Sequence, residues 1–323
     1  MSILLSVEGA IGQGILWGIM ALGVYITFRL LDFADLTVDG SFATGGAVSA
    51  ILIVNGADPV LSLFAALLAG ALAGAVTGML NTLCKIPPIL AGILTQIGLY
   101  SINLMIMGKS NLPLLNSDTI FSKVSQAIHL PRSVSRWLST SNLTVLIIGI
   151  LVAVIVIALL YWFFGTEIGS AIRATGNNEH MVRANGINTN VMIMIALMLS
   201  NALNAFSGAL VAQQQGYADV KMGIGAIVIA LASIVLGEVI FGRKGGFARR
   251  LSSIVTGSIC YRIIVAIVLQ LGLSADNLKL FTAILVGIAL SIPIMMEGSK
   301  QKKMYKKMTE EVDGIEEAFR ADS

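Results

Sequence analysis

Three carboxylates lie close together in an otherwise apolar part of the chain: Asp32, Asp35 and Asp39. Their spacing of three and four residues would place them on one face of a helix. Charged side chains are costly inside a lipid bilayer, and those found there often serve ion binding or gating. The three acids could therefore hold a coupling ion or form a gate. The alternative is that they lie at a water-exposed break between two helices.

Amides within apolar runs form a second group of polar side chains. Asn201 and Asn204 are three residues apart, Gln213 lies at the end of the same run, and Gln96 lies in an earlier one. Amides inside a membrane helix commonly bond to neighbouring helices. The alternative is that they line a path for a polar or zwitterionic solute. The candidate residues for such a path are Asn201, Asn204, Gln213, Gln96, Asp35 and Asp39.

Signatures of catalysis and of metal binding are absent from the sequence. The only Gly-Lys-Ser, at 108–110, has Asn103 where a nucleotide-binding loop needs its first glycine. The two histidines, His129 and His180, have no metal-ligand spacing, and there is no Gly-x-Ser-x-Gly elbow. We therefore expect no catalytic residue, metal or cofactor in this chain, so any ATP and magnesium would be bound by a partner.

The elements that position these residues are membrane-spanning helices. The chain has 323 residues, of which 56% are apolar and 12% charged, and a mean hydropathy of +0.87. This composition excludes a soluble globular or disordered protein and predicts an all-α, polytopic membrane protein. Stretches of about 20 apolar residues span a bilayer, and shorter ones form broken helices. The predicted spans are 9–28, 41–55, 60–80, 89–108, 143–164, 191–213, 223–241, 251–271 and 279–296.

The basic residues predict the orientation of these spans. Most Lys and Arg lie in segments on the same side as the lysine-containing tail, which is typical of cytoplasmic segments. An odd number of spans then puts the N-terminus outside and the C-terminus in the cytoplasm. We divide the chain into a transmembrane domain, 1–296, and a charged cytoplasmic tail, 297–323. Within the domain, 109–142 forms an extracellular connection and 166–190 a cytoplasmic segment.

The cytoplasmic segment 166–190 contains signals for two short helices. Thr166 precedes an apolar-periodic stretch, as an N-cap does, and Gly176 is placed to end the first helix. A second helix is predicted over 178–184, with Gly186 as its stop. A pair of capped helices between two spans is a rigid element that another protein could bind.

Two other stretches place a polar, glycine-containing segment directly before a short apolar helix. One is LDFADLTVDGSFATGGA, which ends at Ala47, and the other is YADVKMGIGAIVIALA, residues 217–232. Paired broken helices in corresponding positions often mark the solute path of a transporter. We expect both stretches to interrupt their spans near such a path.

Four segments of the chain resemble a known family. TEIGSAIRATGNN with the following RANGIN resembles the coupling segment of ABC importer permeases of the branched-chain amino acid, ribose and nucleoside type. LDFADLTVDGSFATGGA, IVLGEVIFG and DNLKLFTAILV resemble the subfamily labelled as tryptophan/tyrosine ABC transporter permeases. The resemblance extends over most of the chain to about residue 296.

The resemblance implies a set of partners. These are a second copy of the permease, two cytoplasmic ATP-binding subunits, an extracellular or periplasmic substrate-binding protein, and the bilayer of a bacterial cell membrane, with no nucleic acid. By the same resemblance, part of the segment 166–190 contacts the ATPase. The residues in that part are Arg173, Ala174, Gly176, Asn177, Arg183 and Gly186.

The expected function is that of a permease subunit in an ATP-driven importer. It would move a small polar organic solute by alternating access coupled to the separate ATPase, with an amino acid as the expected class and an aromatic amino acid as the narrower expectation. The alternative is an ion-coupled secondary transporter in which Asp32, Asp35 or Asp39 binds the coupling ion. The two differ in whether uptake requires an ATPase or only an ion gradient.

Overall fold

The computed structural model describes residues 2–115, 117–127, 140–242 and 245–270, together with the single positions 280, 283, 284, 287 and 291. Helices dominate, as predicted, and two three-residue strands pair with each other in antiparallel register. The elements are α1 Ser2–Tyr25, a π-helical turn Ile26–Leu30, α2 Thr37–Val54, α3 Pro59–Thr82, α4 Pro88–Met107, β1 Asn111–Pro113, α5 Ile120–Ala127, α6 Thr140–Gly165, α7 Glu167–Asn177, α8 Glu179–Ala184, α9 Thr189–Gln215, β2 Tyr217–Asp219, α10 Ala226–Phe241 and α11 Phe247–Gln270.

Seven helices of the described part are long and apolar enough to cross a membrane. They correspond to seven of the nine predicted spans. The predicted span 223–241 is instead the shorter helix α10 of 16 residues. At about 1.5 Å per residue, a helix of that length is shorter than the bilayer core. The ninth, 279–296, lies almost wholly outside the described residues, as does the tail 297–323.

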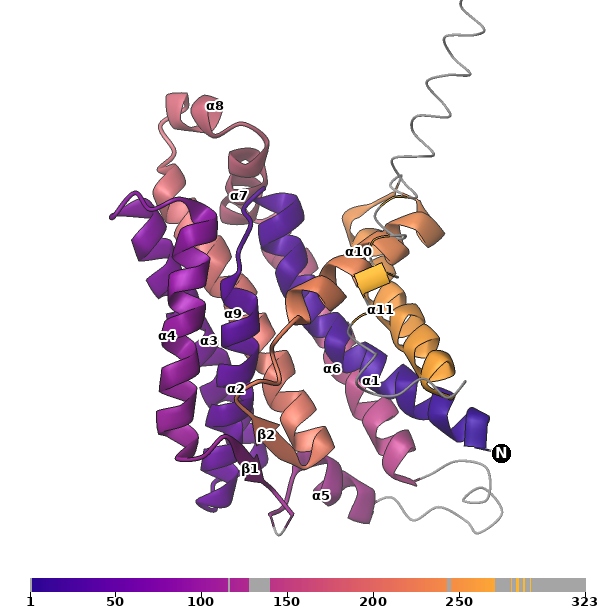
Figure 1. Cartoon of the computed structure of the whole chain (residues 1–323). Helices are drawn as coiled ribbons and strands as arrows, with labels where there is room; N and C mark the ends of the chain where they lie inside the picture. Colours follow the sequence, from indigo (N-terminus) through magenta and orange to yellow (C-terminus); the bar gives the residue numbers. More distant parts are fainter. Residues whose placement is uncertain are drawn as a thin grey trace, which may run out of the picture.

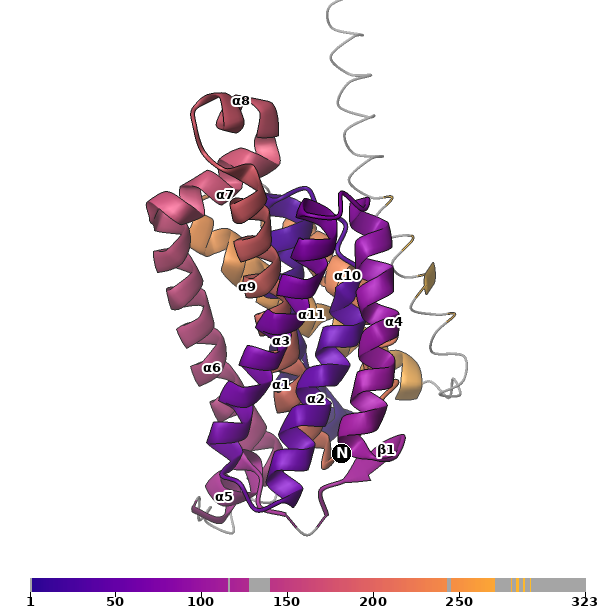
Figure 2. The same cartoon turned by 90° about the vertical axis from the view of Figure 1, so that its left-hand side faces the viewer.

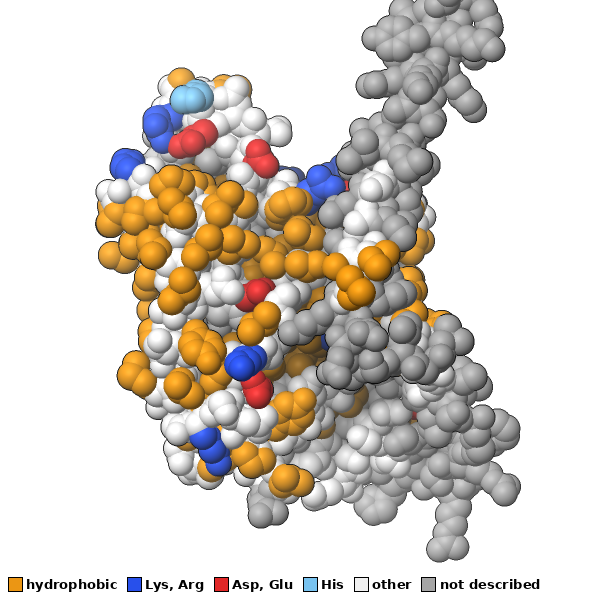
Figure 3. Space-filling view, in the orientation of Figure 1, with side chains coloured by type: hydrophobic (Ala, Val, Ile, Leu, Met, Phe, Trp, Pro, Cys, Tyr) orange, Lys and Arg blue, Asp and Glu red, His pale blue; other side chains and the backbone are white. Residues whose placement is uncertain are grey.

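The helices run between two ends that differ in architecture (Figures 1 and 2). At one end α7 and α8 project beyond the helix bundle, and we call this the hairpin end. At the other lie β1, β2, α5 and the N-terminus, and we call this the sheet end. Figure 3 shows a broad hydrophobic band between the ends, with charged side chains gathered on the projecting hairpin.

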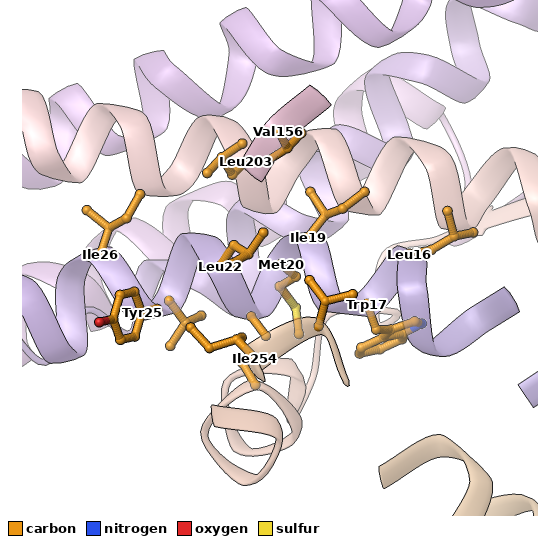
Figure 4. Close-up of a cluster of buried hydrophobic side chains, with 14 of the residues drawn as sticks. Leu16, Trp17, Ile19, Met20, Leu22, Tyr25, Ile26, Val156, Leu203 and Ile254 are labelled. Carbon is orange, nitrogen blue, oxygen red and sulfur yellow. The ribbon is translucent and has the colours of Figure 1, made fainter. Parts of the chain in front are cut away.

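The centre of the bundle is formed by α1 and α9, each of which packs against several other helices. Figure 4 shows the buried cluster along α1, to which α6, α9 and α11 also contribute. The labelled side chains are Leu16, Trp17, Ile19, Met20, Leu22, Tyr25, Ile26, Val156, Leu203 and Ile254.

Glycines allow α2 and α9 to approach each other with their backbones in contact. A Cβ atom on Gly45 would lie 1.8 Å from the carbonyl oxygen of Ala205, and one on Gly208 would lie 1.9 Å from that of Phe42. Lipid provides no hydrophobic driving force between helices, so their association depends on such close packing and on hydrogen bonds.

The helical path is broken at 31–36, between the π-helical turn and α2. Asp32, Asp35 and Asp39 therefore do not share one helix face, because the 3.6-residue period does not continue through this segment, and Asp32 and Asp35 lie in a helix break, as the alternative had it. Asp32 is exposed, Asp35 is buried and Asp39 lies in the first turn of α2. A second break precedes α10, so both predicted interruptions are confirmed.

Candidate functional site

The hairpin formed by α7 and α8 has sharply defined helix ends. Thr166 caps α7 by accepting a hydrogen bond from Gly169 N at 3.3 Å, and Asn178 caps α8 by accepting one from Met181 N at 3.0 Å. Gly186 follows α8 with φ of 83°, which confirms it as the predicted stop. Because side chains satisfy the first backbone donors of each helix, the hairpin has a defined shape of its own.

Gly176 has a different role from the one predicted for it. Instead of ending α7 it lies inside the helix, which continues to Asn177. A Cβ atom at this position would lie 2.0 Å from the carbonyl oxygen of Leu30 and 2.7 Å from Cα of Leu31. The hairpin therefore touches, backbone to backbone, the point where the first span ends and the break begins.

The two arginines of the hairpin differ in the polar contacts that they make within the chain. Arg183 pairs with Glu179 and donates a hydrogen bond to Oγ1 of Thr189 at 2.7 Å, and so ties α8 to the start of α9. The guanidinium of Arg173 lies over the ring of Phe247 at 5.7 Å, on an exposed part of α7. Among the other predicted contact residues, Asn177 is exposed and Ala174 half-buried.

A cleft of about 400 Å³ separates the hairpin from the bundle. It is lined by residues of α7, α8 and α9, by the break at 31–36 and by the elbow between α3 and α4. Asp32 and Lys85, which both line it, have positive φ angles of 55° and 58°. Such backbone conformations are unfavourable for residues other than glycine and are often found where a protein moves.

A buried polar network connects this break to α9. Oδ2 of Asp35 accepts a hydrogen bond from Nδ2 of Asn201 at 2.7 Å, and Oδ1 accepts one from Thr37 N at 2.9 Å. Ser41 Oγ donates to Oδ1 of Asn201 at 2.7 Å. Asp35 is only 2% exposed, and within the described residues no cation pairs with it. These contacts support the interhelical bonding alternative for Asn201.

The same network continues across the bundle through threonine side chains. Oγ1 of Thr37 is 2.7 Å from Oγ1 of Thr77, which in turn donates to Oγ1 of Thr95 at 2.9 Å. The network thus joins α2, α3, α4 and α9 below the hairpin. A displacement of the break would therefore reach four helices through hydrogen bonds.

Gln213 lies at the sheet end and forms a separate polar cluster. Its Nε2 donates to the hydroxyls of Ser49 and Ser62, each at 3.1 Å, and to the carbonyl of Pro59 at 3.2 Å. Its Oε1 accepts a hydrogen bond from Ile120 N at 3.1 Å. With four partners from three elements around it, Gln213 also fits interhelical bonding better than lining a path.

Asn204 lies inside the packing between α9 and α1. Its side chain is fully buried, and Nδ2 is 3.5 Å from Ser200 Oγ. A Cβ atom on Gly23 would lie 2.5 Å from its Oδ1. No room for a solute is apparent at this contact.

Asp39 and Gln96 meet at a cavity of about 350 Å³ between α2, α4 and the segment before α10. Of the six residues predicted for a path, these two line it. The carboxylate of Asp39 accepts hydrogen bonds from Gly225 N at 2.9 Å and Ile227 N at 3.0 Å, and so caps α10. The two broken helices are joined at this point.

Three further polar side chains line this cavity and were not predicted from the sequence. Tyr100, Ser101 and Asn103 all come from α4. Gln96, Tyr100 and Asn103 follow the i, i+4, i+7 spacing of one helix face. That spacing within the span 89–108 was a usable signal. A further missed contact is the ion pair between Arg29 and Glu238, 2.7 Å apart, which joins the end of the first span to α10.

Comparison with known proteins identifies relatives over most of the chain. Residues 6–290 match the family described as "Branched-chain amino acid transport system / permease component". A tyrosine transport system permease protein of Clostridioides difficile is 37% identical, covering 85% of this chain and 86% of the relative. An uncharacterized protein of Rickettsia prowazekii is 32% identical, covering 87% and 95%.

A ribose import permease protein of Bacillus subtilis is 28% identical, covering 88% of this chain and 81% of the relative. The relatives therefore span nearly the whole of the described helices and include permeases with differently named solutes. Together with the apolar helices, these matches establish a multi-pass protein of the bacterial inner membrane. The chain belongs to the permease components of the branched-chain amino acid transport type, which serve ABC transport systems.

Proposed function

We propose that this chain is the membrane subunit of an ATP-driven importer that moves an amino acid, tyrosine or a similar aromatic one, into the cytoplasm. ATP and magnesium bind to a separate ATPase subunit, and a substrate-binding protein delivers the solute from outside. Two copies of the permease form the membrane part. The tyrosine transport permease among the relatives supports this class of solute.

In this proposal the α7–α8 hairpin faces the cytoplasm and binds the ATPase. The observation that carries the proposal is the backbone contact between Gly176 and Leu30. Because no side chain intervenes there, a displacement of the hairpin moves the end of the first span directly. The strained Asp32 and Lys85 lie at the cleft where the hairpin would move.

From Leu30 the displacement has a continuous route to the solute cavity. The break at 31–36 holds Asp35, which is bonded to Asn201 of α9 and to the first turn of α2. The same first turn of α2 carries Asp39, which caps α10. Movement of the hairpin thus changes the positions of α2 and α10, the two broken helices on either side of the cavity, as alternating access requires.

The ion-coupled alternative has little support. It assigned the coupling ion to Asp32, Asp35 or Asp39, and the three acids lie in different environments around the break. Asp35 is bonded to Asn201 and to Thr37 N, and Asp32 is exposed. We therefore propose ATP-driven transport alone.

The test is uptake by the complete transporter in proteoliposomes. We expect L-tyrosine to enter only when the permease, the ATPase and the binding protein are all present and ATP is supplied on the ATPase side. The permease alone should hydrolyse no ATP. Uptake driven by an ion gradient in the absence of the ATPase would contradict the proposal.

A further inference from the structure

The cavity between α2 and α4 contains a hydrogen-bond acceptor without a donor. Asn103 is fully buried, and its Oδ1 accepts no hydrogen bond from the residues that the structure describes. Its Nδ2 is 3.5 Å from the carbonyl oxygen of Gly40. Buried polar atoms without a partner are rare because leaving them so costs free energy, and Asn103, unlike Asn204, lines a cavity from which a donor could reach it.

Asp39 places further acceptor capacity on the same cavity. Its two carboxylate oxygens accept hydrogen bonds from the backbone of Gly225 and Ile227, and each oxygen retains a second lone pair. The residues lining the cavity include this one carboxylate and no Lys, Arg or His. The cavity is therefore suited to a cationic donor group and not to an anionic one.

The remaining lining fits the rest of an amino acid. Ile97, Val220 and Ile224 provide apolar surface, and Tyr100 provides an aromatic ring. Gln96, Tyr100 and Ser101 also carry donors that a carboxylate could accept from. The volume of about 350 Å³ is at the lower end for a small-molecule site, which suits a solute of this size.

From these features we propose that Asn103 and Asp39 bind the ammonium group of the transported amino acid, with its side chain against Ile97 and Ile224. This inference rests on the proposed function and adds to it the site and the recognised group. Asp39 lies at the N-terminus of α10, whose positive end offsets part of its charge. The ammonium is therefore held weakly, as a site on a transport path must be if the solute is to leave it.

The experiment measures protection of a cysteine placed in the cavity. Cys84 and Cys260 are replaced by serine, and Ser101→Cys is introduced as a near-isosteric probe. Ser252→Cys, at an exposed position of α11 away from the cavity, is the matched control. The variants are assembled into the complete transporter, and the rate of modification by N-ethylmaleimide is measured with L-tyrosine or with N-acetyl-L-tyrosine, whose amine is blocked.

We expect L-tyrosine to slow modification of Ser101→Cys, whereas N-acetyl-L-tyrosine does not and Ser252→Cys is unaffected by either. Adding Asn103→Leu should raise the L-tyrosine concentration for half-protection by about tenfold or more, as loss of a hydrogen bond to a charged group predicts. Leu104→Ala, an exposed neighbour on the same helix, should leave that concentration unchanged.

Equal protection by the two compounds, or unchanged protection in the Asn103→Leu variant, would overturn the ammonium site. The ammonium site would also be overturned if a preparation that imports L-tyrosine with ATP showed no protection. In that case the proposed function would stand. If the complete transporter does not import L-tyrosine, the proposed function itself fails. Parallel uptake measurements on the same proteoliposomes therefore separate the two failures, and they also show whether the Asn103→Leu variant is folded.

Discussion

The hairpin end and the sheet end of the molecule hold their elements together in different ways. At the sheet end, Gln213 has four hydrogen-bond partners, and β1 and β2 are paired. At the hairpin end, α7 packs against α6 and α9 and meets Leu30 through the bare backbone of Gly176, beside a cleft with two residues of positive φ. In the proposed function, the sheet end is a fixed support and the hairpin end is the part that moves.

The largest effect should follow from Gly176→Ala. The added Cβ would overlap the carbonyl of Leu30, so α7 must shift from the break. We expect ATP-dependent uptake to fall by at least about tenfold, since misplacement of a coupling element by about 1 Å can have effects of that order. Gly165→Ala is the matched control, because a Cβ there meets nothing within 4 Å. Native uptake in the Gly176→Ala transporter would show that this contact does not transmit motion.

A smaller effect is expected from Arg173→Glu, which reverses a charge on the exposed face of α7 and removes the contact with Phe247. Uptake and ATPase stimulation should fall while membrane insertion is retained. Arg183→Ala should affect both less, because Arg183 is engaged by Glu179 and Thr189 within the chain. The reverse order of the two variants would mean that the shape of the α8 turn matters more than the charge on α7.

At the sheet end, Gln213→Leu should affect stability more than coupling. Ile120 N loses its acceptor, and the hydroxyls of Ser49 and Ser62 lose a donor, which we expect to lower the free energy of unfolding by about 1–3 kcal/mol. Gln215→Leu is the matched control. It makes the same change two residues later in α9, and among the described residues the Gln215 side chain forms no hydrogen bond. Thermal unfolding in detergent measures the difference. If Gln213→Leu instead abolishes uptake at native stability, Gln213 belongs to the solute path.

The smallest effect concerns Asp58, which caps α3 at the sheet end. The hydrogen bond from Val60 N, with a further contribution from Lys123, lowers the pKa of Asp58 below 3.8. Its stabilising contribution is therefore fully present above pH 3.8 and is lost as the pH falls through the lower, folded pKa. The difference in melting temperature between the native protein and Asp58→Asn should shrink on acidification from pH 7 to about pH 3. A difference that grows on acidification would contradict this sign.

Local signals in the sequence predicted the hairpin well. Thr166 and Gly186 act through the backbone within a few residues, so their types and positions were sufficient. Gly176 was misinterpreted because glycine serves both to end helices and to admit a close neighbour. Only the position of Leu30, 146 residues earlier in the chain, distinguishes these uses.

Less of the candidate site than of the hairpin could be predicted from the sequence. The spacing of Asp35 and Asp39 was interpreted with a helical period that the break interrupts. Asn103 lies within an apolar span. Its place in a binding cavity could not be predicted, because α2 and the segment before α10 form the other walls of that cavity. Gln213 has partners from elements far apart in the chain, so its role depends on tertiary structure.

The central claim is that the α7–α8 hairpin binds the ATPase and the sheet end does not. A cysteine-free permease carrying Ser170→Cys on α7, or Ser110→Cys beside β1, provides two exposed and chemically matched positions. Each is labelled with a benzophenone maleimide and illuminated in the assembled, transport-active complex. We predict that the label at Ser170→Cys crosslinks to the ATPase subunit and that the label at Ser110→Cys does not. Crosslinking from Ser110→Cys, or none from Ser170→Cys in an active transporter, would contradict the account.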